Sequence, residues 1–484
     1  MVYSEDYKKL VDATALKDKY YEIDERVEEI CKEAFKGCDK LEEIVMPKKL
    51  KKIDSEAFQG CSSLTKLTLP SRVASIGRWA FYGCSGLTEL TLPDTLECIE
   101  AFAFCGCSGL TELTLPNRVR IIEVSAFEGC SGLTELTLPN SVKIIGDGAF
   151  AYCSGLEKIT VESGNSRYDS RDNCNSIIDK KTNTLIAGCK NSVIPNGVTS
   201  IGDSAFGWCS EFTELVLPNS VTSIVESAFA YCSGLEKITV ESGNSRYDSR
   251  DNCNSIIETA TNTLIAGCKN SVIPNSVTSI GDSAFEGCTG LTELTLLKSV
   301  TSIGDSAFEG CTGLTELTLP KSVKSIVDSA FYGCTGLTEL TLSNSLKCIE
   351  AFAFSGCRGI TKLTLPNSVT SIGDSAFGGC SGLTELTLPN SVTSIGDCAF
   401  EGCTGLTELT LPNSITSIGD YAFAYCSDLS KITSLAEIPP MCGFKVFNGV
   451  NKTNCELIVP EGSVAAYTRA EDWNKFSNIR GFSK

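Results

Sequence analysis

The chain of 484 residues contains no histidine. It therefore lacks the usual general base near neutral pH, the Ser-His and Cys-His nucleophile pairs, and the imidazole ligands of metal sites. It also has no run of about 18 or more apolar residues, so we expect no membrane insertion. The N-terminal stretch is charged throughout and has no apolar core of the kind found in secretory signals. These absences argue against an enzyme and against a membrane-embedded protein.

Basic residues are in the minority, with 41 against 59 acidic residues and a net charge of −18. Such a chain is repelled by nucleic-acid phosphates and by anionic membrane surfaces. We therefore expect no nucleic-acid partner. The acidic excess favours solubility, and a preference for basic or cation-bridged partners is the alternative interpretation.

The chain is dominated by an internal repeat. A Phe that follows Ala and precedes Cys by three residues recurs, mostly in steps of 23, at Phe35, Phe58, Phe81, Phe104, Phe127, Phe150, Phe206, Phe229, Phe285, Phe308, Phe331, Phe354, Phe377, Phe400 and Phe423. Two steps, from Phe150 and from Phe229, are 56 residues long and so contain insertions of 33 residues. A fixed period of about 20 to 30 residues with recurrent leucines is typical of a leucine-rich solenoid.

The repeat that begins at Ala126 shows what one coil contains. Its "LTELTL" alternates like a strand and ends at Pro139, and "SVKII" is a second short extended piece. The expected inward residues are Phe127, Cys130, Leu133, Leu136, Leu138, Val142, Ile145 and Ala149. An Asp in the following turn is expected to cap a helical turn, at Asp147, Asp203, Asp282, Asp305, Asp374, Asp397 and Asp420. We predict an α/β leucine-rich repeat solenoid of about 15 coils of 23 residues, with a parallel β-sheet face, two β-hairpin insertions and terminal caps.

The predicted organisation has three parts. Residues 1–26 form an N-terminal cap that is in part helical, and residues 27–433 form the solenoid, with insertions at about 163–195 and 242–274. Residues 434–484 form a C-terminal cap with a strand at "CELIVP" and a helix after it. Because a solenoid needs an end piece over its last coil, we expect Trp473 and Phe476 to cover that coil.

Of the 26 cysteines, fifteen follow the marker Phe by three residues and are expected to form a buried ladder of free thiols. The insertions hold four others. If Ile178 faces Leu185 in a hairpin, Cys174 faces Cys189, and the same arithmetic pairs Cys253 with Cys268. Disulfides would form there if the protein is exported, and free thiols are the default. We expect no metal site and no cofactor, although "YDSRDNCN" offers oxygen atoms that could hold calcium.

The tetrapeptide "AYCS" occurs only in coils that precede a departure from the 23-residue spacing. Tyr152, Tyr231 and Tyr425 replace the usual Gly there. Two of these coils lead into the insertions and the third leads into the C-terminal segment. We infer that the Tyr ring covers the base of a hairpin or cap, while shared ancestry by duplication explains the first two copies equally well.

The repeat "AFEGCTGLTELTLPNSVTSIGDSAF" resembles the BspA-like (Treponema-type) leucine-rich repeat family, from about Val27 to the C-terminus. The C-terminal segment resembles the cap of bacterial members. The resemblance implies a bacterial protein that is exposed on the cell surface or secreted and that adheres to host matrix proteins or to other bacteria. The absence of a signal sequence leaves a cytoplasmic location as the alternative.

Two outward columns of the predicted sheet, one of Glu and one of Thr, are the candidate partner-binding surface. Lysines interrupt the Glu column at Lys66, Lys158, Lys237, Lys362 and Lys431. The candidate residues are Glu89, Glu112, Glu135, Glu293, Glu316, Glu339, Glu385, Glu408, Thr91, Thr114, Thr137, Thr318, Thr341 and Thr387. Stacked like charges repel and do not stabilise a sheet, so a binding role is plausible, although duplication of one solvated face would produce the same columns.

These observations predict a non-enzymatic, monomeric solenoid that binds a protein or glycoprotein through its sheet face. An adhesin-like surface protein is the first hypothesis. An intracellular scaffold or secreted effector with the same fold is the second.

Overall fold

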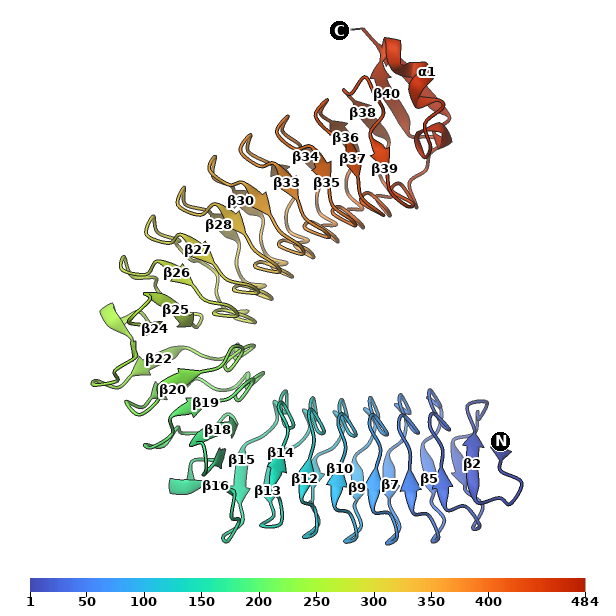
Figure 1. The fold of residues 1–484 in the computed structure, drawn as a ribbon, viewed down its shortest axis with the longest axis vertical. Helices are drawn as coiled ribbons and strands as arrows, with labels where there is room; N and C mark the ends of the chain where they lie inside the picture. The colour runs from blue at the N-terminus through green and yellow to red at the C-terminus, as the bar shows by residue number, and fades with distance from the viewer. Residues whose placement is uncertain (484) are drawn as a thin grey trace. The chain divides into compact units, whose positions relative to one another are not determined.

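The structure is a computed structural model that describes residues 1–483 and contains two compact units. The first unit comprises residues 1–235 and 240–245, and the second comprises residues 236–239 and the described chain from 246 onward. In each unit, short strands of successive coils lie side by side (Figure 1). Their register equals the sequence period, since Ile53 pairs with Ile76 and Thr318 with Thr341. The predicted parallel solenoid with 23-residue spacing is confirmed.

Most coils contribute one strand at the position of the "LTELTL" stretch, which we call a face strand. Its middle residue points into the core and its flanking residues are exposed, because side chains alternate along a strand. In the first unit these strands are β3 (Tyr20–Glu22), β5 (Glu43–Val45), β7 (Lys66–Thr68), β9 (Glu89–Thr91), β11 (Glu112–Leu113), β13 (Glu135–Leu138), β15 (Lys158–Val161) and β20 (Glu214–Leu217). From residue 237 onward they are β22 (Lys237–Val240), β28 (Glu316–Thr318), β30 (Glu339–Thr341), β32 (Lys362–Thr364), β34 (Glu385–Thr387), β36 (Glu408–Leu411), β38 (Lys431–Ser434), β40 (Glu456–Pro460) and β41 (Asn478–Phe482).

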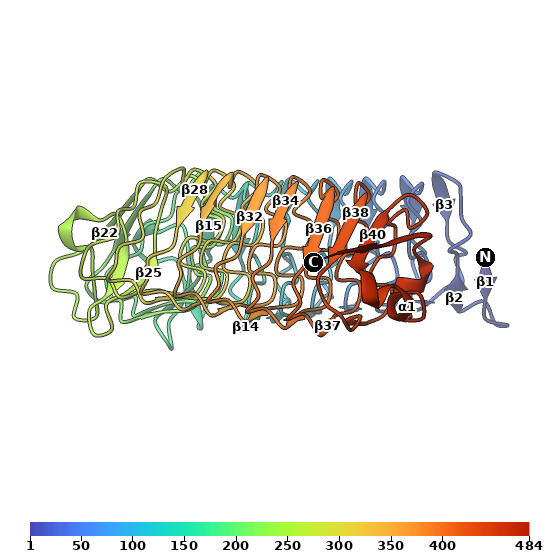
Figure 2. The ribbon, with the colours of Figure 1, turned by 90° about the horizontal axis from the view of Figure 1, so that it is seen from above.

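The second extended piece of each coil forms a shorter strand, which we call a side strand. In the first unit these are β2 (Lys9–Asp12), β4 (Glu29–Ile30), β6 (Lys52–Ile53), β8 (Ser75–Ile76), β10 (Cys98–Ile99), β12 (Ile121–Ile122), β14 (Ile144–Ile145), β19 (Ser200–Ile201) and β21 (Ser223–Ile224). In the second unit they are β26 (Ser279–Ile280), β27 (Ser302–Ile303), β29 (Ser325–Ile326), β31 (Cys348–Ile349), β33 (Ser371–Ile372), β35 (Ser394–Ile395), β37 (Ser417–Ile418) and β39 (Met441–Cys442). Figure 2 shows β34, β36 and β38 along one edge of the second unit and β37 along the other.

The marker phenylalanines fill the core as stacks of rings, which run from Phe35 to Phe150 and from Phe206 to Phe229 in the first unit. From Phe35 to Phe150, the ring centroids of neighbouring coils are 4.7 to 5.7 Å apart and the rings are nearly parallel. Phe285 to Phe423 form an equivalent stack in the second unit. Since no coil can bury its apolar face alone, this stacking is what makes a short repeat stable. Seven of the eight inward residues expected for the Ala126 coil are buried, and Ile145 is half-buried.

The fifteen ladder cysteines are all buried free thiols, as the repeat predicts. Each Sγ donates a hydrogen bond to a backbone carbonyl of the preceding coil, which in most coils belongs to the marker Phe. Cys130 Sγ lies 3.3 Å from Phe104 O, and Cys403 Sγ lies 3.3 Å from Phe377 O. Burial raises the pKa of such thiols, to about 12 for Cys380. The ladder therefore holds coils together and is chemically inert at neutral pH.

The helical turn expected after each side strand is wrong, because the segment from Asp to Cys is a run of turns without helix. The Asp carboxylates also have another role. Asp374 Oδ1 accepts the backbone N–H of Asp397 at 2.8 Å, and Asp397 Oδ1 accepts that of Asp420 at 2.7 Å. The carboxylates therefore bridge successive coils. Burial, followed by the charges of Asp282 and Asp328, raises the pKa of Asp305 in the same column.

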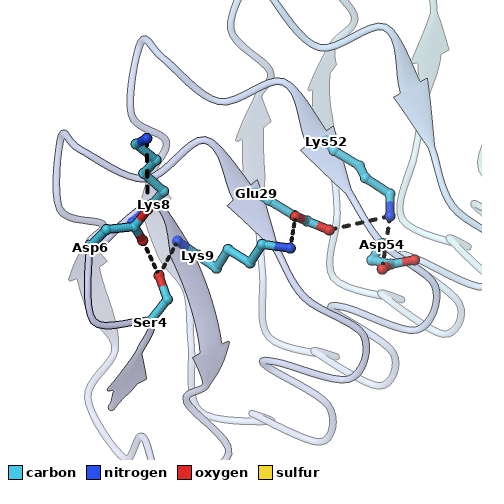
Figure 3. A network of polar contacts seen from close by, with 7 residues as sticks. All are labelled: Ser4, Asp6, Lys8, Lys9, Glu29, Lys52 and Asp54. Carbon is cyan, nitrogen blue, oxygen red and sulfur yellow. Dashed lines mark hydrogen bonds and ion pairs between the residues drawn. The ribbon is translucent and has the colours of Figure 1, made fainter.

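The helical part expected for residues 1–26 is also wrong, because this segment forms strands. After β1 (Val2–Tyr3), β2 pairs with β4 in the parallel ladder and β3 pairs with β5. Leu10 is fully buried at the centre of β2. Its charged neighbours pair across coils: Lys9 Nζ lies 2.7 Å from Glu29 and Lys52 Nζ lies 3.3 Å from the same carboxylate (Figure 3). The charged segment of residues 1–26 therefore continues the parallel ladders of the solenoid.

Each insertion is a β-hairpin that joins the ladder. In the first, β17 (Ile177–Asp179) pairs antiparallel with β16 (Tyr168–Asp169) and with β18 (Thr184–Ala187), and β18 pairs in parallel with the side strand β19. Ile178 faces Leu185 as predicted, but a bulge beside it shifts the register. The second insertion repeats this with β23 (Tyr247–Asp248), β24 (Ile256–Glu258) and β25 (Thr263–Ala266), and the 3-10 turns are η1 (Arg171–Asn173) and η2 (Arg250–Asn252).

The insertion cysteines are buried free thiols in this structure. Cys189 Sγ lies 3.5 Å from Asn175 O, and Cys174 Sγ lies 3.8 Å from Ser176 O. The disulfides expected under oxidising conditions, including that between Cys253 and Cys268, stay a prediction.

The "AYCS" tyrosines occupy a left-handed backbone position. Tyr152 has φ of 62°, a conformation that the equivalent Gly129 (φ 71°) adopts without strain. The Tyr152 ring lies edge-on to Trp208, which stacks on Tyr231 at 4.4 Å, so the three rings form one aromatic cluster. Tyr425 lies against Gly449, where an added Cβ would come within 3.0 Å of its ring. Aromatic contacts of this kind offset the backbone strain.

The C-terminal segment continues the Phe stack and closes it. Phe447 stacks on Phe423, and Trp473 and Phe476 contact Phe447 at 5.3 and 5.4 Å. Both covering residues are buried as predicted, and Trp473 Nε1 donates to Pro440 O at 2.9 Å. The expected strand is β40, while the expected helix is only a short α1 (Val464–Tyr467) between η3 (Glu461–Ser463) and η4 (Trp473–Lys475).

Candidate binding face

The structure places every candidate residue of the two columns on the exposed side of the face strands, which we call the sheet face. All eight glutamates and all six threonines are exposed. They stand in register, since Thr137 pairs with Thr160 and Thr387 with Thr410. Glu293 lies in a coil where the face strand is not formed, and Thr114 follows directly after β11. The columns are therefore ladders that are interrupted where a face strand is not formed and where an insertion separates two coils.

Lysines in the Glu column pair with the glutamate of a neighbouring coil. Lys66 Nζ lies 2.7 Å from Glu89, and that hydrogen bond raises the pKa of Lys66. Lys362 pairs with Glu385 at 2.8 Å, and Lys158 and Lys431 make the equivalent contacts with Glu135 and Glu408. These positions are neutralised within the protein, so they offer less charge to a partner.

Elsewhere on the sheet face, glutamate stacks directly on glutamate. Glu112 pairs in register with Glu135, and Glu316 with Glu339. Within the described residues, Glu112, Glu316 and Glu339 have no ion-pair partner. Like charges on adjacent strands destabilise a sheet, so these residues do not contribute to the fold. They leave carboxylates exposed and uncompensated.

The surface at Glu112 and Glu135 is also hollowed. A depression of about 550 Å³ is lined by residues of three successive coils, including Glu112, Thr114, Asn117, Glu135, Thr137 and Glu162. Sequence reasoning identified four of these but missed Asn117 and Glu162, which lie in turns outside the columns. Glu162 also accepts the backbone N–H of Asn140 at 3.0 Å and so holds the turn beside the depression. The site can offer a ligand the unpaired carboxylate of Glu112 and two hydroxyls, beside the carboxylates of Glu135 and Glu162, which already have partners.

The oxygen-rich insertion loops are occupied by internal contacts. Asp169 accepts a hydrogen bond from Arg171 Nε at 2.9 Å, and Asp248 is held by Arg250 in the same way at 2.8 Å. Each carboxylate is therefore already paired with a cation. Over residues 1–483, no helix combines the length and the hydropathy needed to cross a bilayer.

Comparison with known proteins identifies the family. A family model described as "BspA type Leucine rich repeat region (6 copies)" matches residues 15–95, 75–180, 176–266, 264–384 and 348–451. These segments cover most of the chain. The chain belongs to the BspA-type leucine-rich repeat family. The resemblance inferred from "AFEGCTGLTELTLPNSVTSIGDSAF" is thereby confirmed, and the match extends into residues 15–26 ahead of the expected solenoid boundary.

Several solved structures are similar to this BspA-type chain. A leucine-rich cell surface protein from Faecalibacterium prausnitzii is 27% identical, with 77% of this chain and 83% of that chain covered and a TM-score of 0.43. A leucine-rich repeat protein from Bacteroides ovatus is 29% identical, with 75% and 83% covered and a TM-score of 0.33. One from Eubacterium ventriosum is 25% identical, with 71% and 84% covered and a TM-score of 0.40. The search among curated proteins returned no significant match.

Proposed function

We propose that this BspA-type protein is a non-enzymatic adhesin-like protein that binds a protein or glycoprotein partner through its sheet face. The observation that carries the proposal is the stacking of Glu112 on Glu135 and of Glu316 on Glu339, in which only Glu135 has a lysine partner, Lys158. The fold gains nothing from this arrangement, because lysine occupies the same column in other coils and forms ion pairs there. A basic surface on a partner would neutralise both pairs.

The partner's expected chemistry follows from the columns. Carboxylates alternate across each face strand with threonine hydroxyls, so the sheet face suits lysine or arginine side chains flanked by hydrogen-bonding groups. An exposed charge mainly accelerates and orients association, so binding should weaken as salt is added. A location on the cell surface, which similarity to a cell surface protein favours, belongs to the same proposal.

A charge-reversal variant tests the sheet face. Glu112, Glu135, Glu316 and Glu339 are changed together to lysine, the residue found in this column at Lys66 and Lys362, and folding is checked beside binding because the new lysines stack on one another. The purified protein is titrated against a panel of extracellular matrix glycoproteins and against intact bacterial cells. We expect saturable binding by the original protein and an affinity at least ten-fold lower for the variant, with an unchanged circular dichroism spectrum. Equal affinities would remove the sheet face from the proposal.

The matched control reverses two charges that already pair internally. Exchanging Lys362 and Glu385 for each other keeps the ion pair and the net charge. We expect this variant to bind as the original protein does. Protease treatment of intact producing cells separately tests the location, since loss of the chain before lysis supports a surface protein. Survival until lysis would favour the intracellular scaffold.

A further inference from the structure

A second depression adjoins the first but has the opposite charge. It has a volume of about 620 Å³ and is lined by Glu97, Asn117, Arg118, Arg120, Ser141 and Lys143. Asn117 lines both depressions, so they meet at the turn that follows β11. In a chain with a net charge of −18, three cations facing one carboxylate form an unusual local environment.

The basic residues depart from the repeat at positions where the fold requires no charge. Equivalent coils read "NSVT", as at 219–222, 367–370 and 390–393, whereas this coil reads "NRVR". Arg120 and Lys143 are stacked directly, since the Lys143 N–H donates to Arg120 O at 2.8 Å. In the equivalent place Thr416 donates its hydroxyl to Thr393 O. Stacked like charges in place of such hydroxyls repel one another, and an anion bound between them would relieve the repulsion.

The cations are not compensated by the protein. Among the described residues, Arg118 and Arg120 have no ion-pair partner, although Lys9, Lys66 and Arg167 each pair with a carboxylate. Lys143 Nζ contacts only neutral acceptors, Asn140 O at 3.0 Å and Ser166 Oγ at 2.8 Å. Its charge is therefore positioned but not neutralised.

An unsatisfied buried hydroxyl lines the same depression. Ser141 Oγ is buried and has no hydrogen-bond partner among the described residues. At equivalent positions Ser220 donates to Val198 O at 2.8 Å and Ser414 to Val392 O at 2.7 Å. Ser299 and Ser368 are unsatisfied as well, but they do not line this depression. A buried polar group without a partner is costly, and because this oxygen has almost no exposed surface, a ligand would reach it only after a local rearrangement of the turn.

We propose that the depression between Arg118, Arg120 and Lys143 binds a sulfate or phosphate ester carried by a sugar. Two guanidinium groups present planar forks that match tetrahedral oxyanions, and the ammonium adds a third charge-assisted donor. The volume lies in the range of small-molecule sites, so it accommodates a sugar ring as well as the anion. The cluster is too small, and the surrounding surface too acidic, for a nucleic acid.

The test uses variants that convert this coil to the common repeat. Arg118→Ser with Arg120→Thr restores "NSVT", which folds in several other coils. The control, Lys324→Thr with Lys347→Thr, removes the same charge from stacked residues of the same column in the second unit. Ligand-detected NMR measures binding of N-acetylglucosamine 6-sulfate, its 6-phosphate, unmodified N-acetylglucosamine and sodium sulfate.

We expect both esters to bind the original protein and the control at least five-fold more tightly than they bind the Arg118/Arg120 variant. Unmodified sugar should not bind. If sodium sulfate binds as tightly as the esters, the site holds the free ion and the sugar part of the proposal is overturned. No binding of any anion, or an equal loss in the control, overturns the proposal entirely. Because the glutamate variants leave this cluster unchanged, the proposal stands or falls independently of partner binding at the sheet face.

Discussion

The coil that contains "AFAF" at residues 351–354 offers a matched test of the aromatic stack. Phe354 is fully buried, with ring centroids 5.3 Å from Phe331 and 5.4 Å from Phe377. Phe352, two residues earlier, is 45% exposed and has φ of 56°, in the left-handed region. Changing each to alanine removes the same atoms from the same coil. We expect Phe354→Ala to disrupt the local stack and Phe352→Ala to leave it intact.

The expected magnitudes differ several-fold. Removing a fully buried Phe side chain costs about 3–5 kcal/mol, because it combines the lost transfer free energy with a cavity. The two ring contacts account for about 0.5–1.5 kcal/mol each within that total. The exposed ring of Phe352 buries about half as much surface and no ring contact holds it in place, so its removal should cost less than about 1 kcal/mol.

Hydrogen exchange measured by mass spectrometry resolves this effect locally, which suits a repeat protein that need not unfold in one step. Peptides spanning residues 331–400 should lose protection in Phe354→Ala by roughly the factor of a hundred or more that 3 kcal/mol implies. The same peptides should be nearly unchanged in Phe352→Ala. Equal losses in the two variants would refute the claim that the Phe stack holds the coils together.

Three further outcomes follow from the contacts between coils. Burial raises the pKa of ladder thiols such as Cys380 from the usual 9.0 to about 12. The unfolded chain therefore releases thiol protons above pH 9 while the folded chain keeps them. The free energy of unfolding should fall between pH 9 and pH 12, by about 1.4 kcal/mol per pH unit for each such thiol. A free energy of unfolding in urea that stays constant from pH 8 to pH 10.5 would contradict this. Asp397→Asn keeps an acceptor for the Asp420 N–H and relieves repulsion in the Asp column, so it should melt at or above the original temperature, whereas Asp397→Ala should lose about 1 kcal/mol. Glu316→Lys creates an ion pair with Glu339 like that of Lys66 with Glu89, so its melting temperature should be equal or higher; a clear decrease would show that the glutamate stack supports the fold.

The repeat made the core predictable and left the contacts between coils undetermined. Residues that recur every 23 positions must stack in register, so the burial of Phe127 and Cys130 followed from spacing alone. The Asp carboxylates could not be assigned in this way, because their acceptor role depends on a backbone N–H of the next coil. A turn containing Asp is equally compatible with a helical cap.

The exposed columns of the candidate site were also predictable, since alternation along a strand decides which side chains point outward. The ion pairs between the lysines and glutamates of these columns were less predictable. Whether Lys158 neutralises Glu135 depends on coil-to-coil distances, and Asn117 and Glu162 belong to turns that the columns do not include. At the N-terminus, charge suggested a cap in part helical, but Lys9 and Glu29 pair across coils and allow a further strand. The replacement of "NSVT" by "NRVR" is visible in the sequence, but only the structure shows that Arg118 and Arg120 line a depression together with Lys143.

Carbodiimide cross-linking of the protein to a binding partner from the matrix or cell panel tests the central claim most directly. This reagent joins carboxylates to amines in direct contact, and mass spectrometry identifies the joined residues. We expect partner lysines to be linked to Glu112, Glu135, Glu316 or Glu339. Cross-links confined to carboxylates away from the sheet face, such as Asp203 or Asp282 in the turns, would contradict binding through the acidic column.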